Sequence, residues 1–103
     1  MKRRRVPARM RSLFWNVDFE RLDVNRNADA VIARVVEFGK FVDVQWAIRF
    51  YGQERIHRFF KEVGSPEISD RTVAFWRAFF HAEGEAWPRP PAWRRNSSVP
   101  WID

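Results

Sequence analysis

Residues 44–63, VQWAIRFYGQERIHRFFKEV, decide the fold, because their apolar residues predict two helices joined at Gly52. The first half carries two apolar stripes on different sides of one helix, and the second of these stripes is formed by Trp46 and Phe50. The second half carries a single stripe, at Ile56, Phe59, Phe60 and Val63. A glycine can take the backbone conformation that ends a helix and turns the chain. We therefore predict a helix-turn-helix-like corner on which the rest of the chain packs.

Capping residues set the bounds of the neighbouring predicted helix. Asn27 is placed to cap a helix over residues 28–38, and Gly39 supplies its stop. Asp43 is placed to cap the first helix of the corner, where its charge also favours the positive end of the helix dipole. We therefore expect only a short connection between these two helices.

A last helix is expected after the loop over residues 64–69. Ser69 or Asp70 can cap it, and the pattern predicts that it runs to about residue 81 or 82. One broad side of it carries Phe75, Trp76, Phe79 and Phe80. The opposite side carries Arg71, Ala74, Arg77, Ala78 and His81. Because these residues are small or basic, we predict that this face binds a partner protein, with a plain solvated surface as the alternative.

Length and composition describe one small domain. The chain has 103 residues, of which 46% are hydrophobic and 17% aromatic. It has no cysteine, so six tryptophans and ten phenylalanines must supply the stability of the core. No apolar run approaches the roughly 20 residues of a membrane span, and the N-terminus lacks the apolar segment of a secretory signal. We expect a cytoplasmic protein.

These features predict an all-α fold, a small single-domain bundle of about four helices over residues 12–84. A flexible basic arm, residues 1–11, is expected before the bundle. A Pro/Trp-rich extended tail, residues 85–103, is expected after it. Prolines in the tail forbid a regular helix, and its three tryptophans are costly to leave in water, so we expect the tail to dock on its own domain.

The net charge of +6 is concentrated at one end of the chain. Residues 1–11 hold six basic residues and no acid, whereas residues 12–84 hold nearly equal numbers of both. If the protein binds duplex DNA, the expected phosphate contacts are Lys2, Arg3, Arg4, Arg5, Arg9 and Arg11. There are two alternatives for this basic segment. It is a solubilising tail, or the true start of the protein is Met10.

Catalytic motifs are absent from the sequence. Its two histidines, His57 and His81, fall on separate predicted helices, and His57 is expected to be solvated. There is no cysteine nucleophile, glycine-rich phosphate loop or spaced set of metal ligands. We therefore expect a protein that is not an enzyme and has no metal or cofactor.

A DNA-reading helix has two possible placements. The second helix of the corner would present Gln53, Glu54, Arg55 and Arg58 to the duplex. The last helix would instead lead with Ser69, Arg71 and Thr72, and Arg77 would contact the DNA backbone. Acidic residues on the first of these helices work against phosphate binding, so neither placement is strongly indicated.

Four segments carry a resemblance to a known family: LFWNVDFERLD, ARVVEFG, RFYGQERI and ISDRTVAFW, in this order over residues 12–82. They resemble small uncharacterised bacterial and archaeal proteins that are often encoded beside abortive-infection nucleotidyltransferase toxins. The LFW start and the RTxxFW helix are their most recognisable parts. The chain departs from the usual pattern in its basic arm and in residues 64–67, a loop that is typically more basic.

The resemblance implies an antitoxin-like role, in which the protein neutralises a neighbouring toxin, regulates its operon, or both. The leading prediction is a non-enzymatic partner that binds such a toxin. A DNA-binding regulator is the alternative, and a structural adaptor is a third class. A homo-oligomer is compatible with all three.

Overall fold

The computed structural model describes residues 5–88, and the regular structure in this part of the chain is helical, with no strand. Two short 3-10 helices come first, η1 (Ala8–Phe14) and η2 (Phe19–Arg21). The α-helices are α1 (Ala28–Phe38), α2 (Phe41–Tyr51), α3 (Gln53–Arg58) and α4 (Asp70–Phe79). A π-helical turn, η3 (Phe59–Val63), extends α3. The predicted all-α class is confirmed.

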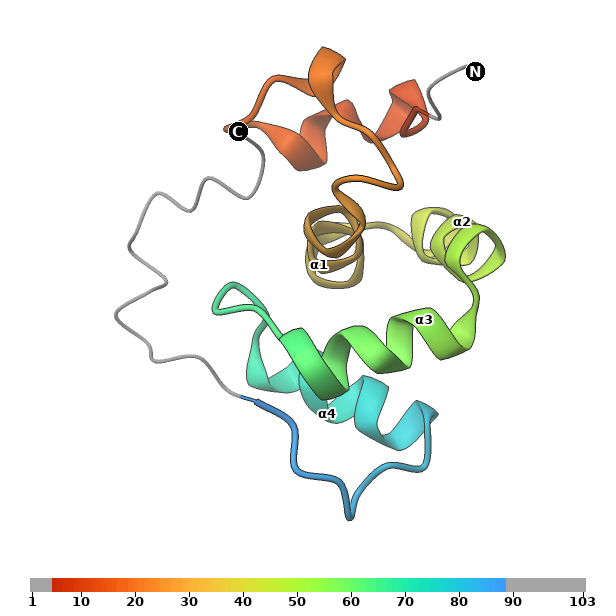
Figure 1. Cartoon of the computed structure of the whole chain (residues 1–103), viewed down its shortest axis with the longest axis vertical. Coiled ribbons are helices and arrows are strands. Elements are labelled where there is room, and N and C mark those ends of the chain that lie inside the picture. Colours follow the sequence, from red (N-terminus) through yellow and green to blue (C-terminus); the bar gives the residue numbers. More distant parts are fainter. Residues whose placement is uncertain (1–4, 89–103) are drawn as a thin grey trace.

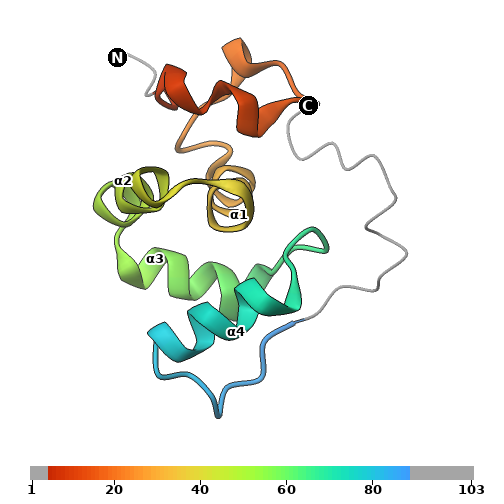
Figure 2. The same cartoon turned by 180° about the vertical axis from the view of Figure 1, so that it is seen from behind.

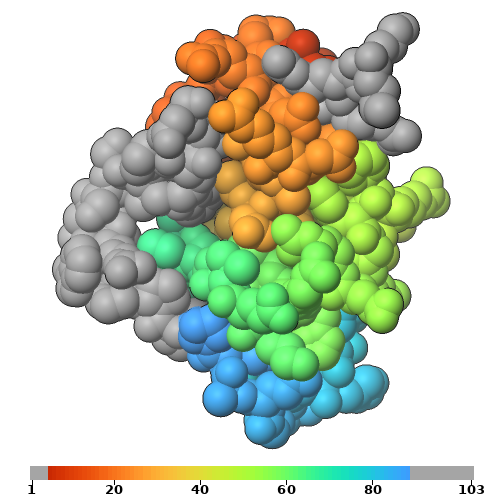
Figure 3. Space-filling view, viewed as in Figure 1, coloured from red at the N-terminus to blue at the C-terminus, as the bar shows by residue number. Residues whose placement is uncertain are grey.

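The elements follow one another down the long axis of the molecule (Figure 1). The N-terminal 3-10 helices lie at one end, α1 and α2 lie side by side below them, and α3 and α4 form the other end. The view from behind shows the same order (Figure 2). In the space-filling view, the turn before α1 and the start of α1 lie on the visible face between the N-terminal segment and α3 (Figure 3). The chain therefore builds its core mostly from neighbours in sequence.

Helix α1 is the central element of this core. All seven residues from 30 to 36 are buried, because α1 packs against η1, α2 and η3 on different sides. This differs from the expectation that the corner at residues 44–63 is central. Helix α2 buries only Asp43 and Ala47 fully, and the rest of its apolar residues are half-buried or exposed.

A buried arginine in α1 joins distant segments. Arg34 is 2% exposed, and its guanidinium donates to the Leu13 carbonyl at 2.9 Å and to Asn16 Oδ1 at 2.7 Å. Its Nε lies 3.1 Å from Glu67 Oε1, and the guanidinium stacks 4.4 Å above the Trp15 ring. A buried charge needs such partners to offset its loss of hydration. Arg34 therefore ties the N-terminal segment and the loop before α4 to the same helix.

The predicted corner is present. Gly52 has φ of +89°, a backbone conformation that side chains other than glycine rarely adopt, and it separates α2 from α3. Just before it, the Tyr51 hydroxyl donates to the Val24 carbonyl at 2.7 Å, and burial raises the pKa of this tyrosine above its ordinary value. The second glycine with a positive φ, Gly64, ends η3. Glycines thus define both ends of the α3 segment.

Local caps set most helix bounds where they were predicted. Helix α1 has the predicted bounds, although the side chain of Asn27 accepts from the Asp23 amide rather than from its own helix. Ser69 caps α4 by accepting from the Thr72 amide at 3.2 Å. The prediction for Asp43 requires correction, because α2 already begins at Phe41. Asp43 therefore lies inside the first turn and accepts from the Lys40 amide at 2.9 Å.

The expected flexible arm over residues 1–11 requires correction for residues 5–11. Val6 and Met10 are buried, and with Phe14 they form an apolar row that continues into η1. Like charges and a proline favour disorder, but burial of these apolar side chains outweighs the repulsion. Residues 1–4 lie outside the part of the chain that the structure describes.

The end of the described chain packs on the body, as expected for the start of the tail. Trp87 is 7% exposed, and its ring centroid lies 5.0 Å from that of Phe60 in a stacked geometry. The rest of the predicted tail, residues 89–103, lies outside the described residues. Over residues 5–88, no helix is both long enough and apolar enough to cross a membrane.

Candidate functional site

Large apolar side chains are exposed where α2 and α4 face each other. Phe41 is 75% exposed, Phe75 is 59% exposed and Phe79 is 40% exposed. Single exposed apolar residues are common on proteins, but a contiguous apolar patch marks an interaction surface. These three phenylalanines line one hollow, so they form such a patch.

This hollow is a groove of about 400 Å³ between α2 and α4, which we call the α2/α4 groove. One wall comes from α1 and α2, through Val36, Phe41, Val44 and Ile48. The other wall comes from α4, through Arg71, Thr72, Phe75, Trp76 and Phe79. Among the described residues that line the groove, Arg71 is the only charged one. The groove therefore suits an apolar ligand surface better than a polar one.

The sequence around Gly39 positions the first wall. A side chain at Gly39 would place its Cβ 2.6 Å from the Val35 carbonyl oxygen, so only glycine fits this turn without a shift. The close turn starts α2 immediately, and Phe41 becomes the first residue of that helix. Phe41 therefore projects from an exposed first turn instead of packing in the core.

A clamp between α1 and α4 positions the second wall. Glu37 Oε1 accepts from the Ser69 amide at 3.0 Å and from the Ser69 hydroxyl at 3.3 Å. Because Ser69 is also the cap of α4, the carboxylate fixes the start of that helix against the end of α1. The separation of the two groove walls follows from this attachment.

The aromatic side of α4 is divided between core and groove. Trp76 is 2% exposed, and Phe80 is half-buried beside it. Phe75 and Phe79 are instead exposed, and their rings stack with centroids 6.3 Å apart. The sequence pattern grouped all four on one side of the helix. The structure shows that Phe60 of η3 packs on Trp76, whereas Phe75 and Phe79 remain exposed.

The predicted partner-binding face on the other side of α4 is not available as one basic surface. Arg77 donates to the Glu85 carbonyl at 2.9 Å and lies 4.9 Å above the Trp87 ring, so it holds the C-terminal segment. Arg71 lines the groove, and His81 lies beyond the end of α4 at a φ of +54°. Ala74 and Ala78 remain exposed between them.

The predicted phosphate-binding residues are also partly engaged. Arg5 contacts Glu20 at 2.6 Å and Arg11 pairs with the same carboxylate, and these hydrogen bonds hold the pKa of Glu20 below its usual value. Arg9 Nε lies 3.4 Å from Asp43. Lys2, Arg3 and Arg4 lie outside the described residues.

Neither predicted DNA-reading helix has a continuous basic surface. On α3, Arg55 pairs with Asp29 at 2.6 Å, and Gln53, Glu54 and Arg58 are exposed. At the start of α4, the Ser69 hydroxyl caps the helix and also donates to the Thr72 hydroxyl. Ser69 and Thr72 therefore already serve the helix end, and Arg71 lines the α2/α4 groove.

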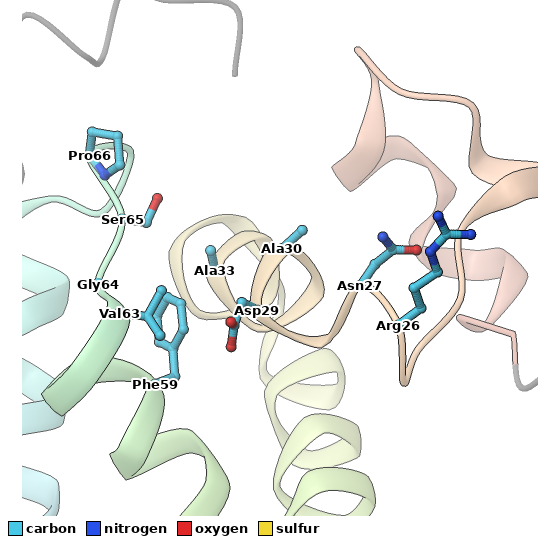
Figure 4. Close-up of a pocket in the computed structure, with 10 residues that line it drawn as sticks. All are labelled: Arg26, Asn27, Asp29, Ala30, Ala33, Phe59, Val63, Gly64, Ser65 and Pro66. Carbon is cyan, nitrogen blue, oxygen red and sulfur yellow. The ribbon is translucent and has the colours of Figure 1, made fainter. Parts of the chain in front are cut away.

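A second hollow of about 280 Å³ lies between the start of α1 and the turn after η3 (Figure 4). Ala30, Ala33 and Phe59 give it an apolar base, and Ser65 and Pro66 come from the turn. Its carboxylate, Asp29, is the partner of Arg55. The lining residues that the structure describes therefore include no pair of groups arranged for acid–base chemistry. Among residues 5–88, no three potential ligands form a metal cluster.

His57 was expected to be solvated, and the structure corrects this expectation. Its ring stacks on Phe80 with centroids 4.6 Å apart, and Nε2 lies 2.8 Å from Glu85 Oε1. Trp87 Nε1 also donates to this carboxylate oxygen at 2.8 Å, and these two hydrogen bonds, that of Trp87 first, lower the pKa of Glu85. Only the cost of leaving Trp87 in water indicated in sequence that the segment would dock.

Together the fold and the groove define a small all-α domain with an exposed apolar surface. A model of a family of unknown function, DUF6922, matches residues 10–60. This match runs from η1 into η3, so it includes the α2 wall of the groove and ends before the α4 wall. Comparison with curated proteins and with solved structures gave no significant match.

Proposed function

We propose that this protein acts without catalysis, as an antitoxin-like protein that binds and neutralises a partner toxin of the nucleotidyltransferase type. The observation that carries the proposal is the α2/α4 groove, with Phe41 and Phe75 exposed on opposite walls. The class of the partner comes from the family resemblance of the sequence segments. The structure supplies the surface that such a partner would cover.

The energetics favour a protein partner for this surface. Fully burying a phenylalanine side chain contributes about 1.5–3 kcal/mol, so covering the two exposed rings would supply several kcal/mol towards association. This gain is reduced by the entropy lost on binding. Arg71 adds one positive charge to the wall, which would orient an acidic group of the partner.

Co-expression with the product of a neighbouring toxin gene tests the proposal. Phe75→Asp places a charge on the apolar wall, and we expect it to abolish capture of the toxin while leaving the folded domain intact. Val63→Asp is the matched control, because Val63 is also an exposed apolar residue but lines the other hollow. Capture by Phe75→Asp at the level of the unchanged protein would refute the role of the groove.

Binding of duplex DNA is the second candidate. The observation that favours it is that Arg5, Arg9 and Arg11 remain exposed even though each has an acidic partner. If these three residues neutralise phosphates, each contributes about 0.9 to the slope of log K against log salt concentration. Replacing all three with glutamine should therefore reduce the magnitude of this slope by about 2.7. Arg26→Gln with Arg49→Gln is the control, because both arginines are exposed and neither belongs to a predicted DNA contact. An unchanged slope would exclude this segment as a DNA contact.

A further inference from the structure

We propose that, in the free protein, the chain's own residues 99–103, VPWID, occupy the α2/α4 groove. Trp101 and Ile102 would fill the apolar lining, and the Asp103 carboxylate would pair with Arg71. The inference goes beyond the proposed function, because it concerns the protein before any partner is bound.

The described chain ends beside α4, the helix that forms one wall of the groove. Pro88, the last described residue, lies in a small hollow beside Val73 of α4. Trp87 stacks on Phe60, and Phe60 stacks on Trp76 with centroids 6.0 Å apart. Trp76 is itself part of the groove lining. The chain therefore leaves the body next to the helix that forms one groove wall.

The remaining chain is long enough to reach the groove. From Pro88 to Val99 it can span about 34 Å in a polyproline conformation, at about 3.1 Å per residue. Pro90 and Pro91 favour this conformation. The principal extents of the molecule are 40 × 31 × 24 Å, so a span of this length reaches from one side of α4 to the other.

The chemistry of the segment matches that of the groove. Grooves lined by aromatic side chains bind proline-containing segments, because an extended proline backbone loses little entropy on binding. The groove supplies Phe41, Phe75 and Phe79 as such a lining. Pro100 and Trp101 would pack on these rings, and Asp103 provides the opposite charge to Arg71. The more basic stretch of the tail, residues 89–95, would remain outside.

The lack of cysteine allows a direct test on the full chain. A nitroxide spin label on the variant Ser98→Cys should strongly reduce the NMR intensities of the Val44 and Ile48 methyl groups, which line the groove. The methyl groups of Val6 and Val24, which do not line the groove, should lose less intensity. Adding Trp101→Ala to the labelled chain should restore the signals of Val44 and Ile48.

Two results would overturn the inference. In the first, the label leaves Val44 and Ile48 unaffected. The second result comes from a mixture of two chains, one with the spin label and no isotopes, the other with isotopes and no spin label. If the intensities of Val44 and Ile48 fall in this mixture, the groove binds a segment of a second copy. Neither result bears on toxin capture by the variant Phe75→Asp, so this inference and the proposed function can fail separately.

Discussion

Glu37 accepts two hydrogen bonds from Ser69, one from its amide and one from its hydroxyl, so the end of α1 holds the start of α4. The position of the α4 wall depends on this contact, although neither Glu37 nor Ser69 lines the groove. Residues that do not line the groove therefore help to set its shape.

The first prediction concerns this contact. Glu37→Ala removes two hydrogen bonds, each of which contributes about 0.5–1.5 kcal/mol. We expect the melting temperature to fall by roughly 4–8 °C per kcal/mol lost. Glu62→Ala, at an exposed carboxylate on η3, should leave it nearly unchanged. Equal melting temperatures for the two variants would show that the Glu37 contact does not stabilise α4.

The second prediction concerns Arg34. Arg34→Ala leaves Glu67 and the Leu13 carbonyl without their buried donor, and breaking a buried pair typically costs about 3–5 kcal/mol. We expect a large drop in the urea midpoint of unfolding. Arg49→Ala, at an exposed position on α2, should change stability by no more than about 0.5 kcal/mol. Similar midpoints for both variants would contradict a structural role of Arg34.

The third prediction concerns the N-terminal segment. Met10 is fully buried, so Met10→Ala should lower the free energy of unfolding by about 2–5 kcal/mol. Deleting residues 1–4 is the comparison, because it leaves Val6 and Met10 in place. If denaturant unfolding shows no loss of stability for Met10→Ala, the segment does not belong to the folded core.

The fourth prediction concerns acid stability. The pKa of Glu85 is lowered in the folded protein, so the ionised carboxylate stabilises the fold above its unfolded pKa, and this contribution is lost as the pH falls through the folded value. Glu85→Gln removes the titration. Its melting temperature should therefore fall less than that of the unchanged protein between pH 7 and pH values below about 4.

The control for this experiment is Glu83→Gln, at an exposed carboxylate two residues away. It should keep the acid sensitivity of the unchanged protein. If Glu85→Gln and Glu83→Gln lose stability in parallel on acidification, the contacts of Glu85 with Trp87 and His57 do not contribute to acid sensitivity.

Local signals in the sequence were enough to predict most of the fold. Helix α1 and the cap of α4 depend on residues within a few positions of the helix ends, and the corner depends on Gly52. The start of α2 was placed too late because a charged residue inside the first turn can bond backward to the amide before the helix, as Asp43 does.

The candidate site could not be predicted in the same way. Phe75 and Trp76 are adjacent in sequence, yet one is exposed and the other buried, because Phe60 of η3 packs on Trp76 while Phe75 faces the groove. His57 and Glu85 meet across 28 positions of the chain. Such pairings follow from the packing of helices, and neither periodicity nor charge along the chain specifies them.

Trp76 belongs to the core through Phe60 and Phe80 and to the groove through Phe75 and Phe79. Any molecule that fills the groove therefore adds packing to a side chain on which the folding of α4 depends. Occupancy and thermal stability are linked: a ligand that binds only the folded chain adds about 2.7 kcal/mol when its free concentration is 100 times its Kd. Because Trp76 belongs to both the core and the groove, binding in the groove can be measured as a rise in the melting temperature of the whole domain.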